Sequence, residues 1–381
     1  MSLFAFNNSG NSGNSGNSGN SGNSGNSGNS GNSGNSGDYV SAPASGALLS
    51  NRAGIVGTWQ EPSVDPPVSD TAFDDPAQMK NWSPRVRGLI LDNELSERLT
   101  VDLSGNSAVV SYRARTTKRP MATLVRPDID VLRGQLQYLR GRADLRGDRA
   151  SEILSQTQDI LTFFATITML RPDRHSWTLE LLDALLRATF RIEMRIKHGF
   201  ACRRPVEFSP QIQPMIQTPG HGTLPSGHAT ESFMVAHVLS ALLGDREDWK
   251  KMLWKQAARI SDNRVIAGVH FPIDNVAGAV LGTQLGACFL ALCRAGSSPG
   301  HWKLDAQPEG ADQTADSIGD PSLPVVCKQI ARDDLGGIEP VAGLTSVDDQ
   351  AGSPEIVQTN LMAFMWDKAT KEMETPAPDV A

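Results

Sequence analysis

Residues 218–233, TPGHGTLPSGHATESF, lead a loop rich in Gly, Pro and Thr directly into a helical pattern. Ser226 and Gly227 stand where this helix is expected to begin. The first backbone N–H groups of a helix have no partner within the helix and lie at the positive end of its dipole. A helix that opens on Ser-Gly-His therefore favours an anion-binding site at this point.

Helical patterns flank this loop on both sides. Apolar residues recur three and four positions apart in six segments, and Gly or Pro marks most of their ends. The predicted helices cover residues 128–145, 148–170, 176–199, 226–244, 247–265 and 272–294. The third helix, 176–199, is expected to be capped by Ser176, and the sixth helix is expected to begin near Pro272. The sequence therefore predicts an all-α fold, a helical bundle.

Composition divides the chain of 381 residues into four parts. The predicted boundaries give residues 1–45, 46–125, 126–298 and 299–381. Residues 8–37 repeat Asn-Ser-Gly ten times and contain no apolar side chain, so the first part is predicted to be a disordered linker. The third part is the helical domain.

The two remaining parts are less regular. The segment 46–125 has no role that the sequence identifies, although residues 85–99 suit a helix and residues 107–115 suit a short strand. The tail, 299–381, is polar and rich in Pro and Gly, and it is predicted to be largely irregular with one helix within residues 354–373.

Charge and hydropathy narrow the classes of function. The formal net charge of −7 argues against a protein that binds nucleic acid through its overall charge. Residues 275–293 are uncharged and reach the length of a membrane span, but polar residues and glycines interrupt them, so a core helix is expected there. The N-terminus lacks the pattern of a signal peptide. These features predict a cytoplasmic protein without a membrane span.

Three clusters of chemically active residues lie at predicted helix ends. They are Lys197-x6-Arg204-Pro205, Pro225-Ser226-Gly227-His228 and Arg264-x5-His270-x3-Asp274. The bundle could bring these ends together at one pole. Lysine and two arginines offer fixed cations for an oxyanion, and the planar guanidinium forms paired hydrogen bonds to such oxygens.

The histidines of these clusters suit nucleophilic chemistry. His270 and Asp274 are four residues apart, so the carboxylate can hold the imidazole in one tautomer, as in an activated nucleophile. His228 is then available as a general acid.

The three clusters together resemble the signature of the type 2 phosphatidic acid phosphatase (PAP2) and vanadium-dependent haloperoxidase superfamily. That signature is Lys-x6-Arg-Pro, Pro-Ser-Gly-His and Ser-Arg-x5-His-x3-Asp, and residues 150–295 carry every element in order with one departure. Asn263 stands where the family usually has Ser, which puts the role of this position in doubt. The resemblance implies a helical bundle of the PAP2/haloperoxidase type.

The resemblance also implies roles for individual residues. His270 would be the nucleophile that becomes phosphohistidine, or the ligand of vanadium if vanadate is bound. Asp274 would orient His270, and His228 would protonate the leaving group. Residues implied to bind phosphate or vanadate are Lys197, Arg204, Ser226, Gly227 and Arg264. Asn263 is a possible pocket residue, and so is His221, because some bromide-using haloperoxidases carry a second histidine at a similar place.

Three functions follow from this reading. The favoured one is a phosphatase that hydrolyses phosphate monoesters through phosphohistidine and needs no cofactor. The alternative is a haloperoxidase that holds vanadate in the same pocket and uses peroxide and a halide. The short interval between His228 and Arg264 favours the hydrolase, because the well-known haloperoxidases carry longer insertions there. The third is a non-catalytic anion-binding module. The expected partner is a small phosphorylated substrate, or peroxide plus a halide. Nucleic acid is not expected to bind, and the sequence leaves open whether the protein forms a homo-oligomer.

Deletion of residues 8–37 is expected to leave the melting temperature and the activity nearly unchanged, because the repeat has nothing to pack. Thermal unfolding of the full chain and of the deletion variant measures this directly. A large drop in melting temperature on deletion would contradict the prediction.

Overall fold

The computed structural model describes residues 47, 49–56, 70–114, 117–294, 299–305, 326, 328–330, 340–347, 356 and 358–374. The Asn-Ser-Gly repeat and parts of the tail lie outside these residues, so the linker stays a prediction. The chain divides into two compact units, residues 16–90 and residues 91–381 together with 1–15.

The smaller unit contains short helical turns. They are η2 (Arg52–Val56) and η3 (Pro76–Asn81), followed by α2 (Pro84–Arg98), which continues past residue 90. Asp75 caps η3, since its carboxylate accepts a hydrogen bond from the N–H of Ala77 at 2.9 Å. The helix expected at residues 85–99 is therefore present as α2.

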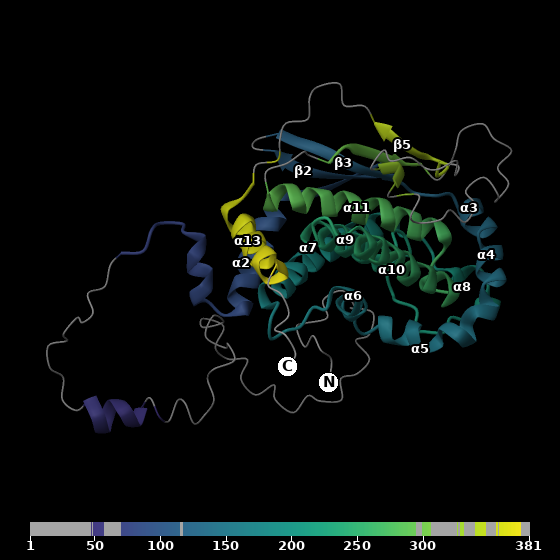
Figure 1. The fold of residues 1–381 in the computed structure, drawn as a ribbon. Helices are drawn as coiled ribbons and strands as arrows, with labels where there is room; N and C mark the ends of the chain where they lie inside the picture. The colour runs from purple at the N-terminus through teal and green to yellow at the C-terminus, as the bar shows by residue number, and fades with distance from the viewer. Residues whose placement is uncertain are drawn as a thin grey trace. The chain divides into compact units, whose positions relative to one another are not determined.

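A helical bundle forms most of the larger unit (Figure 1). Its shorter elements are α3 (Ile129–Gly134), α4 (Leu136–Gly141), η4 (Ala143–Leu145), α5 (Arg146–Gln156), α6 (Leu161–Thr168), α8 (Pro205–Phe208) and η5 (Pro210–Ile212). Its longer helices are α7 (Ser176–Phe200), α9 (Gly227–Leu242), α10 (Glu247–Ile266), α11 (Pro272–Cys293) and α13 (Asn360–Glu374). The last four helices predicted for residues 126–298 and the helix of the tail are therefore present with nearly the expected bounds.

The first two predicted helices are broken into shorter ones. Residues 128–145 form α3, α4 and η4, with Gly134 and Gly141 at the two helix ends. Residues 148–170 form α5 and α6, because Asp159 starts a new helix between them. Its carboxylate accepts from the N–H groups of Leu161 at 2.8 Å and Thr162 at 3.3 Å. A side chain that satisfies free N–H groups in this way competes with helix continuation.

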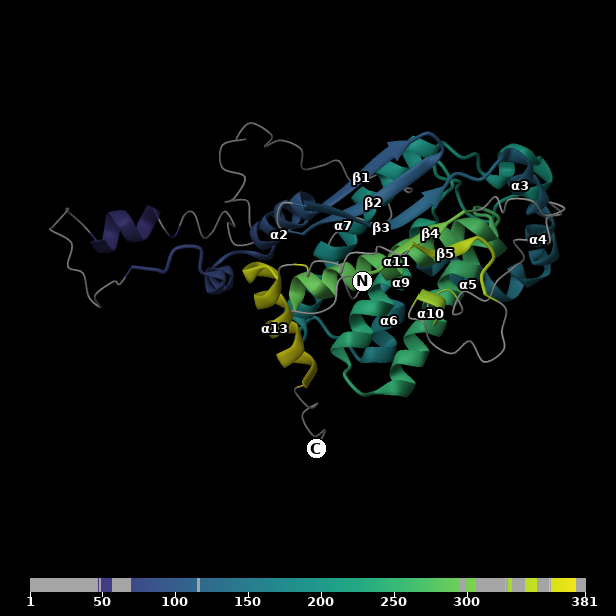
Figure 2. The same cartoon turned by 90° about the horizontal axis from the view of Figure 1, so that it is seen from above.

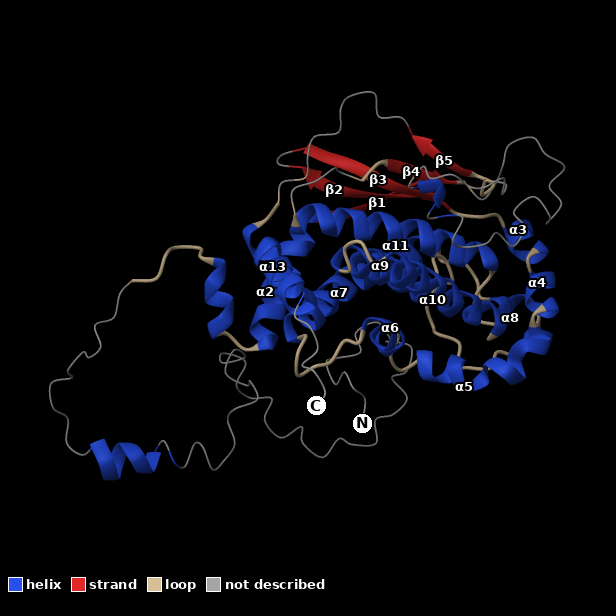
Figure 3. Ribbon diagram, viewed as in Figure 1, coloured by secondary structure: helices blue, strands red, loops and turns tan. Residues whose placement is uncertain are grey.

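A five-stranded sheet shows that the all-α prediction was incomplete (Figure 3). Its strands follow the order β1 (Leu99–Ser104), β2 (Ser107–Ala114), β3 (Thr117–Val125), β4 (His301–Leu304) and β5 (Leu344–Val347). Neighbouring strands are antiparallel except β3 and β4, which are parallel. The strand expected at residues 107–115 is β2. The parallel pair joins residues 122–124 to residues 302–304, and such a distant pairing leaves no local pattern in the sequence.

The sheet covers one side of α11, and α9 packs against another side (Figures 1 and 2). Among the described residues, α11 is the one helix long and apolar enough to cross a membrane. Its most apolar window has a mean hydropathy of 1.8, and 94% of that window is buried within the protein. The fold thus uses α11 as its central helix, which explains why its apolar side chains face every direction.

The free N–H groups at the start of α7 are hydrogen-bonded by a residue from the C-terminal part of the chain. The N–H groups of Trp177 and Thr178 donate to the carboxylate of Glu372 in α13, at 3.0 and 2.8 Å. The residue at the cap position is His175, and its side chain makes no capping bond. The expected cap by Ser176 is therefore wrong, because a distant carboxylate takes this place and also suits the helix dipole.

Gly282 lets α11 approach α9 closely. A Cβ atom at this position would lie 2.2 Å from the carbonyl oxygen of Thr230. We expect Gly282→Ala to lower the free energy of unfolding by about 1–3 kcal/mol, because the two backbones must separate. The matched control is Gly147→Ala, where a Cβ meets no atom within 4 Å. Denaturant unfolding should show loss only for Gly282→Ala, and equal stabilities would contradict the close packing.

Candidate active site

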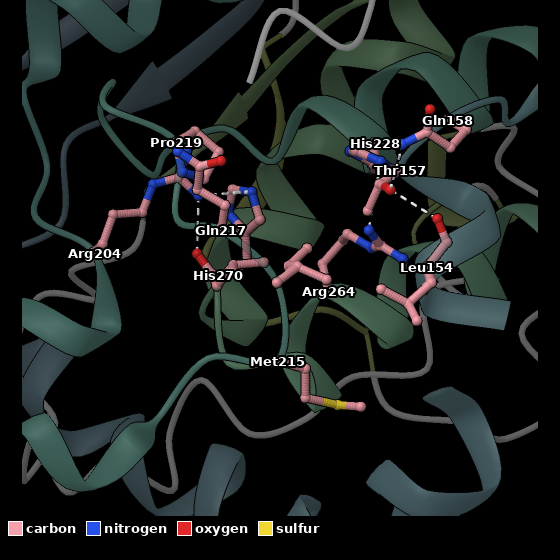
Figure 4. A pocket seen from close by; sticks show the side chains of 12 residues that line it. Leu154, Thr157, Gln158, Arg204, Met215, Gln217, Pro219, His228, Arg264 and His270 are labelled. Atoms are coloured by element: carbon pink, nitrogen blue, oxygen red, sulfur yellow. Dashed lines mark hydrogen bonds between the residues drawn. The ribbon is translucent and has the colours of Figure 1, made fainter. Parts of the chain in front are cut away.

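A cavity of about 340 Å³ collects residues from all three sequence clusters (Figure 4). Arg204, His228, Arg264 and His270 line it. Its remaining lining residues are Leu154, Thr157, Gln158, Met215, Ile216, Gln217, Pro219 and Val269. The cavity therefore has a cationic and imidazole-bearing part and a largely apolar wall, which is a common composition for a small-molecule site.

His270 is held at one nitrogen and presents the other. Its Nδ1 lies 3.0 Å from Oδ2 of Asp274 and 3.2 Å from Oγ1 of Thr223. The same carboxylate oxygen accepts from the hydroxyl of Thr223 and, at 2.8 Å, from the N–H of Phe271. Because an ionised carboxylate can only accept, Nδ1 carries the proton and Nε2 carries the lone pair.

Arg204 stands directly in front of that lone pair. Its Nη1 lies 3.1 Å from Nε2 of His270 and donates to the carbonyl of Val269 at 2.9 Å. Its Nε donates to the carbonyl of His221 at 3.1 Å, and its Nη2 lies 3.1 Å from Nδ1 of His221. His221 therefore contacts the cation that neighbours His270, although it does not line the cavity itself.

Lys197 supports the loop behind the cavity. Its ammonium group donates to the carbonyls of Thr223 at 3.2 Å and Pro225, with Gly222 at 3.5 Å. Three acceptors match the three protons of an ammonium group. Lys197 is 2% exposed and does not line the cavity, so it supplies charge from behind the loop 222–225.

Ser226 caps α9 without using its side chain. Its N–H donates to the carbonyl of Asp274 at 2.9 Å, so this group is already occupied. Its Oγ is buried and has no partner among the described residues. At the next position a Cβ on Gly227 would lie 2.8 Å from Oε2 of Glu193, so a larger residue would displace that carboxylate. The N–H groups from Gly227 onward, which have no intrahelical acceptor, remain as donors.

Arg264 and His228 meet at the end of α5. Nη2 of Arg264 donates to Oε1 of Gln156 at 2.8 Å and to the carbonyl of Ile153 at 3.3 Å. Nε2 of His228 lies 3.2 Å from the carbonyl oxygen of Gln156 and 3.5 Å from Nη1 of Arg264. Asn263 contacts the side chain of Gln156 as well, since its Nδ2 donates to Oε1 of Gln156 at 3.0 Å. Asn263 therefore supports the site from behind.

The three cations are hydrogen-bonded to carbonyl oxygens, and no ion pair among the described residues involves Lys197, Arg204 or Arg264. Burial disfavours the charged form of each. It lowers the pKa of Lys197 to about 8, that of Arg204 to about 10 and that of Arg264 to about 9. Nearby carboxylates offset part of this charge without an ion-pair contact, those of Glu193 and Asp274 acting on Lys197 and that of Glu152 on Arg264. An anion in the cavity would neutralise the remainder.

The same burial affects the histidines and the aspartate. Burial first, and then the charges of Arg204 and Lys197, hold the pKa of His270 well below its ordinary value. Burial and then the charge of Arg264 do the same to the pKa of His228. Burial raises the pKa of Asp274 to about 6, against the effect of its hydrogen bonds. The imidazoles are thus neutral at pH 7 and Asp274 is ionised.

Arg146 fixes the segment that leads into one wall of the cavity. Its guanidinium donates to the carbonyls of Ile266 at 2.9 Å, Gln213 at 2.9 Å and Ile212 at 3.0 Å. The N–H of Met215 also donates to the carbonyl of Ala267 at 2.9 Å. The loop that carries Met215 to Pro219 is therefore joined to the end of α10.

The structure brings the predicted residues into one region but gives them different positions. Those that line the cavity are Arg204, His228, Arg264 and His270, and those that lie behind it are Lys197, His221, Ser226, Gly227, Asn263 and Asp274. Sequence reasoning missed Thr223 and Gln156. Thr223 lies three residues before Ser226 and could have been considered, whereas no motif marks Gln156.

Comparison with known proteins agrees with the predicted family. Residues 177–295, from the first turn of α7 to just beyond α11, match the family model described as the PAP2 superfamily. This helical region is therefore similar to the PAP2 superfamily. The matched stretch is narrower than the expected 150–295, but it contains every predicted site residue. No curated protein matches the chain.

Thirteen chains of solved structures match the protein. One is the crystal structure of the first transmembrane PAP2 type phosphatidylglycerolphosphate phosphatase from Bacillus subtilis. It is 16% identical, the match covers 56% of this chain and 93% of that chain, and the TM-score is 0.34.

The predicted cytoplasmic location is wrong. It is overturned because the region that matches the PAP2 family model contains α11, a helix long and apolar enough to span a membrane. The prediction rested on the lack of a signal peptide at the N-terminus. An apolar helix inside the chain can associate with a membrane without a signal peptide, so the N-terminal sequence does not decide the location.

The pKa shifts predict a narrow pH range for any chemistry that uses both His270 and the cations. Asp274 loses its charge below about pH 6 and no longer orients His270, and Lys197 loses its charge above about pH 8 and weakens anion binding. We expect kcat/KM to fall on both sides of this range. Asp274→Asn should remove the acid limb, and an acid limb that persists in this variant would contradict the assignment.

Proposed function

We propose that the protein is a phosphatase that hydrolyses phosphate monoesters, with His270 as the nucleophile. The observation that supports this most directly is the orientation of His270. Its Nδ1 is bound to Asp274, while Nε2 meets Nη1 of Arg204 at 3.1 Å at the cavity. A phosphoryl group placed against Nε2 would be contacted by an arginine at once.

In the first step, Nε2 of His270 attacks phosphorus and forms the N–P bond. The ester P–O bond breaks, and the leaving alcohol takes a proton from His228. The dianionic phosphoryl group favours the charged form of His228, which opposes the lowering of its pKa by burial. Asp274 stabilises the positive charge that develops on His270.

In the second step, water attacks phosphorus and the N–P bond breaks, which returns the electron pair to Nε2. His228 accepts the proton from the attacking water and is ready to donate again. Arg204, Arg264 and the N–H groups at the start of α9 bind the equatorial oxygens in both steps. Nη2 of Arg264 is engaged by Gln156 and Ile153, so its Nη1, 3.5 Å from Nε2 of His228, is the donor for this purpose.

The apolar wall suggests where the alcohol part of the substrate lies. Leu154, Met215, Ile216 and Val269 stand beside the cationic part of the cavity. An ester with an apolar or aromatic alcohol therefore fits the lining better than a sugar phosphate would.

The test separates the nucleophile from the acid with esters of increasing leaving-group ability. His228→Ala should lose about 10²–10⁴-fold in kcat on an alkyl phosphate but much less on nitrophenyl phosphate, which needs little protonation. His270→Ala should stay inactive on both, because no N–P bond can form. Rapid quenching of the wild type should trap phosphate on His270.

A matched control is His198→Ala, since His198 is exposed near the end of α7. It should behave as the wild type. Equal losses on both esters in the two active-site variants would contradict the assigned roles.

Vanadate, also an oxyanion, would be held by Arg204, Arg264 and His270. Vanadate-dependent bromination without ester hydrolysis would favour the haloperoxidase, and binding without turnover the anion-binding module.

A further inference from the structure

Gln156 is the last residue of α5 and lies outside the stretch that matches the PAP2 family. It is 1% exposed, yet it does not line the cavity. Its side-chain oxygen accepts from Nη2 of Arg264 at 2.8 Å and from Nδ2 of Asn263 at 3.0 Å. Its backbone oxygen lies 3.2 Å from Nε2 of His228. One residue thus contacts two cavity-lining groups through two separate oxygens.

The amide of Gln156 is held in one orientation. Its Nε2 donates to Oε1 of Glu152 at 3.0 Å. Glu152 accepts in turn from Arg259, with contacts of 2.8, 3.0 and 2.8 Å. Since a carboxylate attracts the NH₂ end of an amide, the oxygen end is directed to Arg264. A neutral acceptor there fixes the guanidinium without forming an ion pair with it.

Asn263 acts at the same atom. Its Nδ2 donates to Oε1 of Gln156, while its Oδ1 accepts from Nη1 of Arg149 at 3.3 Å. It is fully buried and does not reach the cavity. The second donor occupies the other lone pair of Oε1, so the side chain of Asn263 meets that of Arg264 at the same acceptor atom of Gln156.

We propose that Gln156 is a positioning residue that orients Arg264 for oxyanion binding, and that Asn263 acts through it. The proposal deepens the proposed function, since it concerns the same site. It explains why Asn263 stands where the family signature usually has Ser, because the Asn263 side chain contacts Gln156, which α5 supplies.

The decisive measurement is binding of inorganic phosphate and of vanadate by titration calorimetry, which requires no turnover. Gln156→Ala should weaken both by about tenfold, because one hydrogen bond to a charged group is lost. Gln156→Glu keeps the shape and places a negative charge on Arg264, so it should weaken binding further. Ser155→Ala, an exposed change in the same helical turn, is the control and should bind as the wild type.

Two further readouts distinguish positioning from general damage to the fold. The backbone oxygen that contacts His228 survives in Gln156→Ala, so the dependence of kcat on the leaving group should match the wild type. In a double-mutant cycle, Asn263→Ala should weaken phosphate binding in the wild type and add nothing in Gln156→Ala. Additive losses, unchanged phosphate binding in Gln156→Ala, or an altered leaving-group dependence would each overturn the proposal.

The same experiments keep this proposal apart from the proposed function. A wild type that binds phosphate, responds to Gln156→Ala as described and hydrolyses no ester would overturn only the phosphatase. A wild type that hydrolyses esters while Gln156→Ala binds phosphate normally would overturn only the role of Gln156. A wild type that does not bind phosphate would overturn both.

Discussion

Carbonyl oxygens solvate the buried cations of this protein, and the arrangement of its helix ends follows from that interaction. Moving a charge out of water costs several kcal/mol unless other groups replace the water. Lys197 receives carbonyls from the loop 222–225, Arg204 from residues 221 and 269, and Arg264 from the end of α5. Carbonyl dipoles lower the cost of burial without cancelling the charge. Carboxylates in the same places would have formed ion pairs and removed the attraction for an anion.

That requirement explains why the site lies where helices end. Carbonyl groups within a helix are already bonded, whereas those of the last turn and of the adjoining loop are free to accept. The end of α5 and the loops that precede α9 and α11 provide them. The N–H groups at the start of α9 face the same region and add their positive potential. Asp274 is an ionised carboxylate that contacts His270, and it accepts from Thr223 and Phe271 as well.

Local signals were sufficient for the long helices, and they marked residues that the structure brings into one region, but they did not give the arrangement of those residues. Helices α7, α9, α10 and α11 carry a clear period and end at Gly, Ser or Pro, so their bounds were predictable. The break at Asp159 was not, because a capping carboxylate competes with a helical pattern that continues across it. The sheet depends on β3 pairing with β4, about 180 residues later in the chain. Gln156 reaches Arg264 for the same reason, through packing that no spacing in the sequence records.

The cavity beside these carbonyl-bound cations also has a kinetic consequence. Inorganic phosphate carries the same oxygens as the phosphoryl group of an ester, so it would keep each contact with Arg204, Arg264 and the start of α9. The protein would then bind its product through the groups that bind its substrate, and only the contacts to the apolar wall would be lost. Release of phosphate would then limit turnover in such a site. The concentration of free phosphate around the protein would set the fraction of molecules whose cavity is free to bind a new ester.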